Sequence, residues 1–219
     1  MKRTLPLLAL ALAATIARAD VVLVQSVDGM AQAGQMTVTV GGDKVRTDIS
    51  PGIYMITNTA TGDVTTIMDA QKSYMVISAA TTKAMMAQGM AQAGNLSTNP
   101  APPAPTGKKD KINGYDAAEY TFSNGNLKVT YWLCANFPNA KVVTDALSKF
   151  EKGGLSAMLK GLTPDLSTLP GVPVKTEVDA NGQKITMELI SAKEQDVDPS
   201  QYTVPAGYTE VKMPAMPQQ

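Results

Sequence analysis

The stretch VPVKTEVDANGQKITMELISAKE, residues 172–194, decides the fold. Apolar and polar residues alternate on both sides of Asn181-Gly182, and alternation with period two is typical of a half-buried β-strand. Asn-Gly favours the type I′ turn that joins two antiparallel strands. The stretch therefore predicts a β-hairpin, with these residues facing the core: Val174, Thr176, Val178, Ile185, Met187 and Leu189.

The same alternation recurs towards the N-terminus. Met36, Val38 and Val40 share one face of a segment that ends at Gly41-Gly42, a second hairpin signal. Short runs of this kind, separated by turn residues, are typical of an antiparallel meander. The strands predicted outside the 172–194 hairpin cover residues 21–27, 36–40, 45–49, 53–59, 63–68, 72–77, 111–122 and 127–133, and a last short strand lies in the C-terminal tail.

Two segments have a helical pattern instead. Residues 80–93 are rich in alanine and methionine, and residues 139–161 carry an apolar stripe that includes Phe150. Residues 95–109 are rich in Pro, Ser and Thr, which predicts a flexible insertion. The expected fold is α+β: one curved antiparallel sheet of roughly ten strands, shaped as an open half-barrel, with both helices packed on its concave face.

The first nineteen residues have the pattern of a secretory signal peptide. Lys2 and Arg3 precede an apolar run, and Ala17-Arg18-Ala19 is a cleavage pattern. We therefore expect a signal peptide at residues 1–19, one domain at 20–219, a periplasmic or secreted location, and no integral membrane segment after cleavage. Loss of Lys2, Arg3 and Arg18 leaves 16 basic against 19 acidic residues. This mildly acidic balance argues against nucleic acid as a partner.

Most catalytic arrangements are excluded by composition. The 219-residue chain has no histidine and one cysteine, Cys134, so Ser-His-Asp and Cys-His catalysis and histidine metal sites are absent. Cys134 follows Trp132 and Leu133 at the end of a predicted strand, where a buried cysteine is the simplest interpretation. The composition does not exclude an enzyme that uses carboxylates or a Ser-Lys pair. We expect no enzyme, no catalytic residue, no metal site and no cofactor.

Three methionines mark the candidate site. Met85, Met86 and Met90 lie within the predicted helix at 80–93, and methionine suits surfaces that accommodate varied apolar partners. They are interpreted as a lid over a cavity that Trp132 and Phe150 also line. Plain core packing is the alternative for all of them. Cu(I) binding through thioethers is a further one, because Met86 and Met90 stand one helical turn apart.

Several segments together resemble an exported bacterial family. They are DVVLVQS (20–26), GDKVRTD (42–48), DVTTIMDAQKSYMVI (63–77), KINGYDAAEYTF (111–122), NFPN (136–139) and VDPSQYTVPAGY (197–208). In this order they are similar to domain-of-unknown-function family 4412. The last one is also similar, more distantly, to the end of the outer-membrane lipoprotein carriers and sorting proteins.

The resemblance to the carriers implies a curved sheet that holds acyl chains under a helical lid. A latching arginine is not carried over, because Arg46 does not match its place. The function we expect is non-enzymatic binding of a hydrophobic small molecule, lipid or acyl chain. The alternative is an envelope protein-interaction or structural module, with an envelope protein as partner and a self-filled core.

Overall fold

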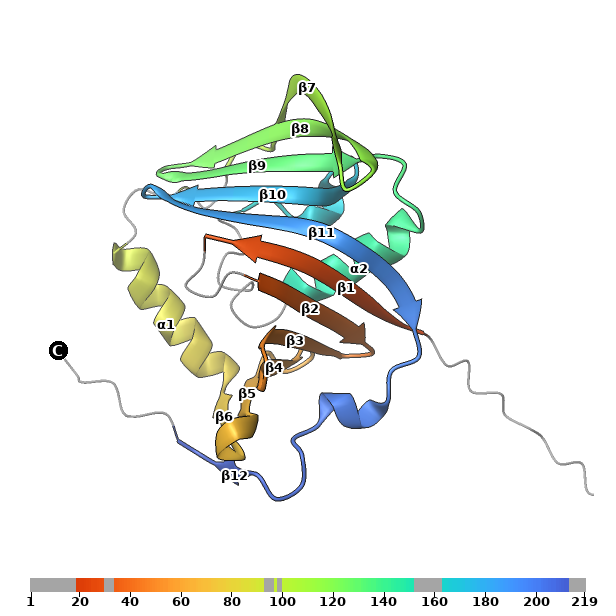
Figure 1. The fold of residues 1–219 in the computed structure, drawn as a ribbon. Helices are drawn as coiled ribbons and strands as arrows, with labels where there is room; N and C mark the ends of the chain where they lie inside the picture. Colours follow the sequence, from red (N-terminus) through yellow and green to blue (C-terminus); the bar gives the residue numbers. More distant parts are fainter. Residues whose placement is uncertain (1–18, 30–33, 93–96, 98–99, 152–162, 213–219) are drawn as a thin grey trace, which may run out of the picture.

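The computed structural model describes residues 19–29, 34–92, 97, 100–151 and 163–212. Within these ranges the chain forms a twelve-stranded sheet, two α-helices and three 3₁₀ turns (Figure 1). The strands are β1 (Asp20–Asp28), β2 (Gly34–Gly41), β3 (Lys44–Ser50), β4 (Ile53–Asn58), β5 (Val64–Met68), β6 (Ser73–Ile77), β7 (Ala104–Ile112), β8 (Tyr115–Asn124), β9 (Leu127–Cys134), β10 (Val172–Ala180), β11 (Gln183–Gln195) and β12 (Thr209–Glu210). The helices are α1 (Ala79–Gln92) and α2 (Ala140–Glu151), and the 3₁₀ turns are η1 (Asp69–Gln71), η2 (Leu166–Thr168) and η3 (Pro199–Tyr202).

The sheet is open, in the order β12-β6-β5-β4-β3-β2-β1-β11-β10-β9-β8-β7. Its neighbouring strands are antiparallel except β12 and β6, which are parallel. The β10–β11 hairpin is confirmed: Asn181 and Gly182 have φ values of 54° and 85°, as a type I′ turn requires, and Val178 pairs with Ile185. β1 pairs with both β2 and β11, so it joins the N-terminal meander to this hairpin.

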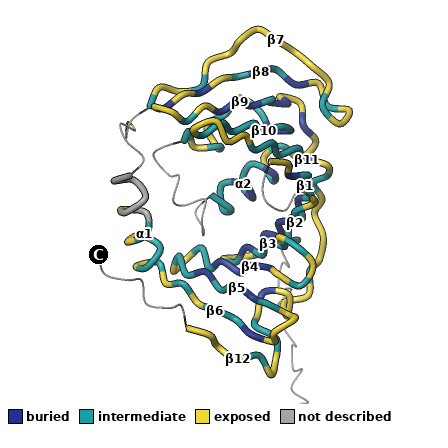
Figure 2. Tube along the Cα trace, turned by 60° about the vertical axis from the view of Figure 1, so that its left-hand side comes forward, coloured by how far each residue is buried: buried dark blue, intermediate teal, exposed yellow. Residues whose placement is uncertain are grey.

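Two strand predictions are corrected. Residues 111–122 are not one strand, because Asn113 and Gly114 take positive φ values (48° and 87°) and turn the chain between β7 and β8. Residues 104–109, expected to belong to the flexible insertion, form the first part of β7. β7 is an edge strand that is exposed along nearly its whole length (Figure 2), so it has no apolar alternation that sequence could reveal.

The helix α2 packs against the centre of the sheet. Its buried residues, Val143, Ala146 and Leu147, belong to one core cluster with residues of β1, β2, β3 and β10. The spacing of these three residues gives an apolar stripe along one side of the helix. We call the side of the sheet that α2 contacts the α2 face. Leu23, Val38 and Val174 lie on it and are almost completely buried.

The helix α1 leaves the β6 end of the sheet and runs along its open side (Figure 1). Among its residues whose exposure is described, none is buried. An open sheet with two helices agrees with the coarse expectation from sequence. The finer expectation, that both helices cover a concave face, stays a prediction.

The C-terminal segment, residues 196–210, crosses the other side of the sheet, and we call it the strap. The Tyr202 hydroxyl donates to Asp20 Oδ2 at 2.7 Å, and the Lys44 ammonium donates to the carbonyl oxygen of Tyr202 at 3.2 Å. β12, at the end of the strap, pairs with β6. The strap therefore connects β1 and β3, near the centre of the sheet, to the β6 edge.

Candidate functional site

A row of side chains crosses five adjacent strands on the α2 face. Residues paired in antiparallel strands point to the same face. The row runs through Val27 of β1, Met187 of β11, Thr176 of β10, Tyr131 of β9 and Tyr120 of β8. Val27 and Tyr131 are buried, whereas Met187, Thr176 and Tyr120 are half-buried. This part of the α2 face is therefore apolar and partly open to solvent.

A small core cluster supports this row. Phe122, Val129, Tyr131 and Leu133 are buried together, and Leu166 and Leu169 pack against them from the η2 segment. Aromatic and branched side chains of this kind give large, stiff apolar surfaces. The cluster fixes the position of Tyr131 within the row.

The α2 face of β3–β6 is covered in part: Val45 and Val64 are buried on it, but a second row is more open. This row runs through Val38, Thr47, Met55, Thr66 and Met75. Val38 and Thr47 are buried, but the three residues nearer the sheet edge are half-buried. Two of those three are methionines, whose flexible thioether side chains adapt to the shape of a partner. The half-covered methionines make this end of the α2 face a second apolar surface.

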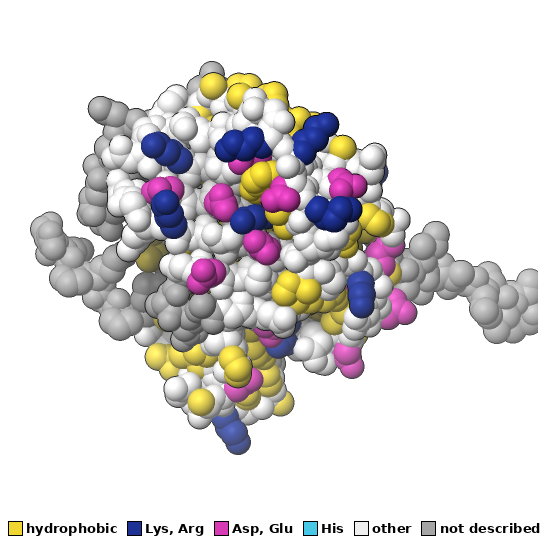
Figure 3. Space-filling model, turned by 45° about the horizontal axis from the view of Figure 1, so that its top comes forward, with side chains coloured by type: hydrophobic (Ala, Val, Ile, Leu, Met, Phe, Trp, Pro, Cys, Tyr) yellow, Lys and Arg dark blue, Asp and Glu magenta, His cyan; other side chains and the backbone are white. Residues whose placement is uncertain are grey.

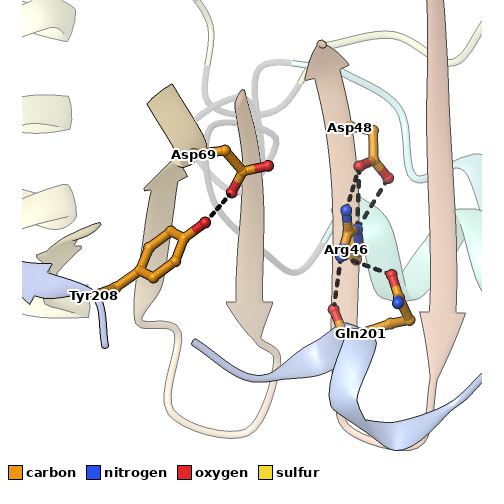
Figure 4. A network of polar contacts seen from close by, with 5 residues as sticks. All are labelled: Arg46, Asp48, Asp69, Gln201 and Tyr208. Atoms are coloured by element: carbon orange, nitrogen blue, oxygen red, sulfur yellow. Dashed lines mark hydrogen bonds and ion pairs between the residues drawn. The ribbon is translucent and has the colours of Figure 1, made fainter. Parts of the chain in front are cut away.

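The opposite face of β3–β6 is covered in part by the strap (Figure 4). Tyr54, Ile56 and Ile67 are buried there, with Tyr208 of the strap packed against them. The Tyr208 hydroxyl donates to Asp69 Oδ1 at 2.9 Å, and this hydrogen bond raises the pKa of Tyr208. The strap thus covers this apolar cluster.

Arg46 anchors the strap at its other end. Its guanidinium donates to both carboxylate oxygens of Asp48, with the shortest distance 2.7 Å from Nη2 to Oδ1. It also donates to the side-chain and backbone oxygens of Gln201 at 2.9 and 3.2 Å, and lies 3.7 Å from the centre of the Tyr54 ring. Arg46 is thus held by a carboxylate, an aromatic ring and the strap. These contacts give Arg46 a structural role.

The corresponding face of β7–β11 is charged. Lysines and acidic residues alternate over it (Figure 3). Lys175 lies 2.9 Å from Glu177 and 3.4 Å from Glu188, and Lys108 lies 3.2 Å from Glu119. Mixed charges of this kind are typical of a solvent-facing surface. The apolar candidate surface is therefore the α2 face.

One acidic group lies at the border of this apolar surface. Glu151, the last residue of α2, is half-buried, and its Oε2 accepts a hydrogen bond from the backbone N–H of Leu166 at 3.2 Å. The pKa of Glu151 is raised to about 7, mainly by burial; the Leu166 hydrogen bond opposes this shift, and the Asp165 carboxylate contributes to it. Burial, together with the charge of Glu151, also raises the pKa of Tyr131. An acidic group and a phenol therefore share one edge of the site.

The residues predicted from sequence fall at different places. Met85 is half-buried on α1, whereas the side chains of Met86 and Met90 lie outside the described part of the structure. Phe150 is half-buried on α2 and packs against the main core cluster. Trp132 also packs against that cluster, but it pairs with Glu119 and Lys175, on the face opposite Tyr131. Their contact with a ligand stays a prediction.

Sequence reasoning did not single out Met55, Met75, Tyr131 or Glu151. Strand alternation separates the two faces of each strand, but it does not say which face α2 covers. The position of Glu151 depends on η2, fifteen residues further along the chain, and no local pattern indicates it.

A separate pocket lies at another place. Its volume is ≈ 580 Å³, and it lies between the start of β1, the β2–β3 turn and the strap, with Asp20, Lys44 and Tyr202 in its wall. Among the described residues no group of three or more acidic or cysteine side chains could hold a metal ion. Cys134 is buried, as expected. Within the same ranges, no helix is long and apolar enough to cross a membrane.

Comparison with known proteins identifies a family but no activity. Residues 21–208 match the family described as "Domain of unknown function (DUF4412)". No curated protein matches the sequence. Two solved structures of PNGF-II, in different space groups, are similar at 12% identity with TM-scores of 0.46 and 0.43. They cover 89% and 90% of this chain, which spans only 32% and 31% of theirs.

Proposed function

The chain belongs to the DUF4412 family, and we propose that it is an exported, non-enzymatic protein that binds an apolar ligand on the α2 face of its sheet. The ligand class is a lipid or an acyl chain. The observation that carries the proposal is the pair of half-buried apolar rows on that face, which contain Met55, Met75 and Met187. Export rests on the signal-peptide pattern of residues 1–19, which lie mostly outside the described ranges.

The composition of the rows suits a flexible chain. Ligand sites are mostly apolar, with a few polar groups that fix orientation. Methionines in both rows offer adaptable contacts, while Tyr120 and Thr176 add hydroxyl groups. On the opposite side, the strap covers the apolar cluster of the β3–β6 half, and the β7–β11 half carries ion pairs. This distribution supports the α2 face as the binding surface.

Binding should be tested with two variants of adjacent residues. Met75 and Val76 are neighbours on β6, and alternation directs them to opposite faces. Met75→Glu should weaken the binding of decan-1-ol about tenfold or more, because it places a charged group against the alkyl chain of the ligand. Val76→Glu, at a position already 43% exposed, should leave binding unchanged. Equal effects of the two variants would contradict the proposal.

The natural ligand is sought by native mass spectrometry of protein taken from a bacterial periplasm, followed by organic extraction. We expect a bound species that releases lipid or acyl chains into the organic phase. A clean unliganded mass with no extractable lipid would favour an envelope interaction module. The observation behind that alternative is α2, whose buried residues already fill the centre of the same face.

The function of α1 as a lid is part of the proposal. Met85 is half-buried and none of the α1 residues of described exposure is buried, so the helix is weakly held, and Gly89 within it weakens it by about 1 kcal/mol relative to alanine. Amides of residues 80–92 should exchange hydrogen faster than those of β10–β11, and should slow when an alkyl ligand is added. Equal protection without ligand would show that α1 is ordinary core.

A further inference from the structure

The polar edge of the α2 face constrains the head group of its ligand. Glu151 is half-buried at the end of α2, and its described hydrogen bond comes from a neutral backbone N–H, that of Leu166. No ion pair to Glu151 is formed within the described part of the chain, in contrast to Glu119 and Glu177, which pair with lysines. A carboxylate that is partly removed from water without a cation is an unfavourable state, and a cationic partner would relieve it.

Tyr131 and Glu151 both lie near Leu166. The backbone N–H of Leu166 donates to Glu151, and Leu166 also packs against the buried cluster that contains Tyr131. The Tyr131 hydroxyl makes no hydrogen bond with the described residues, and a phenol can accept as well as donate a hydrogen bond. Glu151 and Tyr131 therefore place two acceptor groups around Leu166, at the border of an apolar surface.

Among the described residues around Glu151, no lysine or arginine pairs with its carboxylate. η2 contributes the Leu166 N–H, β9 contributes Tyr131, and Lys149 on α2 donates to the carbonyl oxygen of Gly42 at 2.8 Å. Asp165, just before η2, is also acidic, and its Oδ1 accepts from the N–H of Ser167. The Glu151 carboxylate itself therefore favours a positive group over an anionic one.

We propose that the apolar ligand of this protein is a cationic amphiphile, whose ammonium head is bound by the Glu151 carboxylate and the Tyr131 hydroxyl while its alkyl chain lies along the α2 face. This inference rests on the proposed function. An ammonium supplies three N–H donors, and its hydrogen bonds to a carboxylate are charge-assisted. A fatty acid anion would meet repulsion at the same place.

The test uses three ligands with the same alkyl chain at pH 8: decylammonium and decanoate below their micelle concentrations, and decan-1-ol below its solubility limit. Titration calorimetry with the full mature protein should show decylammonium binding at least about tenfold tighter than decan-1-ol, the gain typical of one hydrogen bond to a charged group. Decanoate should bind more weakly than decan-1-ol. The preference should shrink at pH 6, where Glu151 is mostly protonated.

The decisive variant is Glu151→Gln, which keeps the size of the side chain and removes its charge. It should bind decan-1-ol like the wild type but lose the preference for decylammonium. Glu119→Gln is the matched control, because Glu119 pairs with Lys108 on the opposite face; it should keep the preference.

The outcomes separate the two claims. Equal binding of the three ligands, or a preference that survives in Glu151→Gln, overturns the head-group inference and leaves the proposed function standing. Failure of all three ligands to bind overturns the proposed function, and this inference with it.

Discussion

The two ends of the sheet carry separate apolar clusters, and these lie on opposite faces. In β8–β10 the cluster of Phe122, Val129 and Tyr131 lies on the α2 face, and the other face carries ion pairs. In β3–β6 the cluster of Tyr54, Ile56 and Ile67 lies under the strap. The α2 face there keeps half-buried methionines at the sheet edge. The strap thus stabilises one half from one side, while the methionines at the edge of the α2 face stay half-covered.

The largest effect is expected from the cluster under the strap. Ile67 is completely buried, so Ile67→Ala should lower the free energy of unfolding by about 3–4 kcal/mol. Met75→Ala, on the adjacent strand and the other face, should cost about 1 kcal/mol, because its side chain is half-buried. Urea denaturation measures both. Similar losses would mean that the α2 face of β3–β6 is ordinary core.

Loss of the strap anchor should have an intermediate effect. Arg46→Ala removes the hydrogen bonds to Gln201 and the contact with Tyr54, and should lower the free energy of unfolding by about 1–2 kcal/mol. Amide exchange in residues 199–210 should accelerate more than exchange in β10–β11. Tyr208→Phe, which removes the hydrogen bond to Asp69, should have a smaller effect of the same kind. If strap exchange is unchanged in Arg46→Ala, the strap is held by its other contacts.

A smaller effect should depend on pH. The pKa of Glu151 is raised to about 7 in the folded chain from an ordinary value of 4.5, so the folded state holds this proton more tightly. The stability that the folded state gains from holding this proton is fully present below pH 4.5 and is lost as pH rises through 7. Glu151→Gln should therefore gain stability relative to wild type between pH 5 and pH 8, by about 1 kcal/mol after solvent screening. If the free energies of unfolding of the two proteins change with pH in the same way, the pKa of Glu151 is not raised in the folded chain.

The smallest effect is expected from an exposed ion pair at the β7–β8 edge of the sheet. Lys111 and Asp116 form this ion pair at 3.0 Å, and both side chains are well exposed. Lys111→Ala should change the free energy of unfolding by less than about 0.5 kcal/mol, as exposed ion pairs usually do. A loss comparable with that of Arg46→Ala would show that the β7–β11 half also depends on ion pairs at its exposed edge.

The sequence predicts those parts of the fold whose signals are local. The β10–β11 hairpin is encoded by alternation and by Asn181-Gly182, and the apolar stripe of α2 by Val143, Ala146 and Leu147. β7 was missed as a separate strand because its exposed residues carry no alternation and its pairing depends on β8. β12 is two residues long, and its position follows from the path of the strap.

The candidate site was predicted less completely. Methionine and an apolar surface were expected, but from α1, whereas the rows on the sheet are carried by Met55, Met75 and Met187. Alternation groups the residues of one strand face without telling which face the strap or α2 will cover. That choice depends on tertiary packing of segments distant in sequence, as does the contact between Glu151 and Leu166.

The central claim is that an apolar ligand binds on the α2 face and not under the strap. Methyl NMR of protein labelled with ¹³C at methionine and isoleucine methyl groups tests it directly during titration with decan-1-ol. The account predicts that the signals of Met55, Met75 and Met187 shift, while those of Ile56 and Ile67, buried under the strap, do not. Shifts confined to Ile56 and Ile67, or no saturable shift at any of the five, would contradict it.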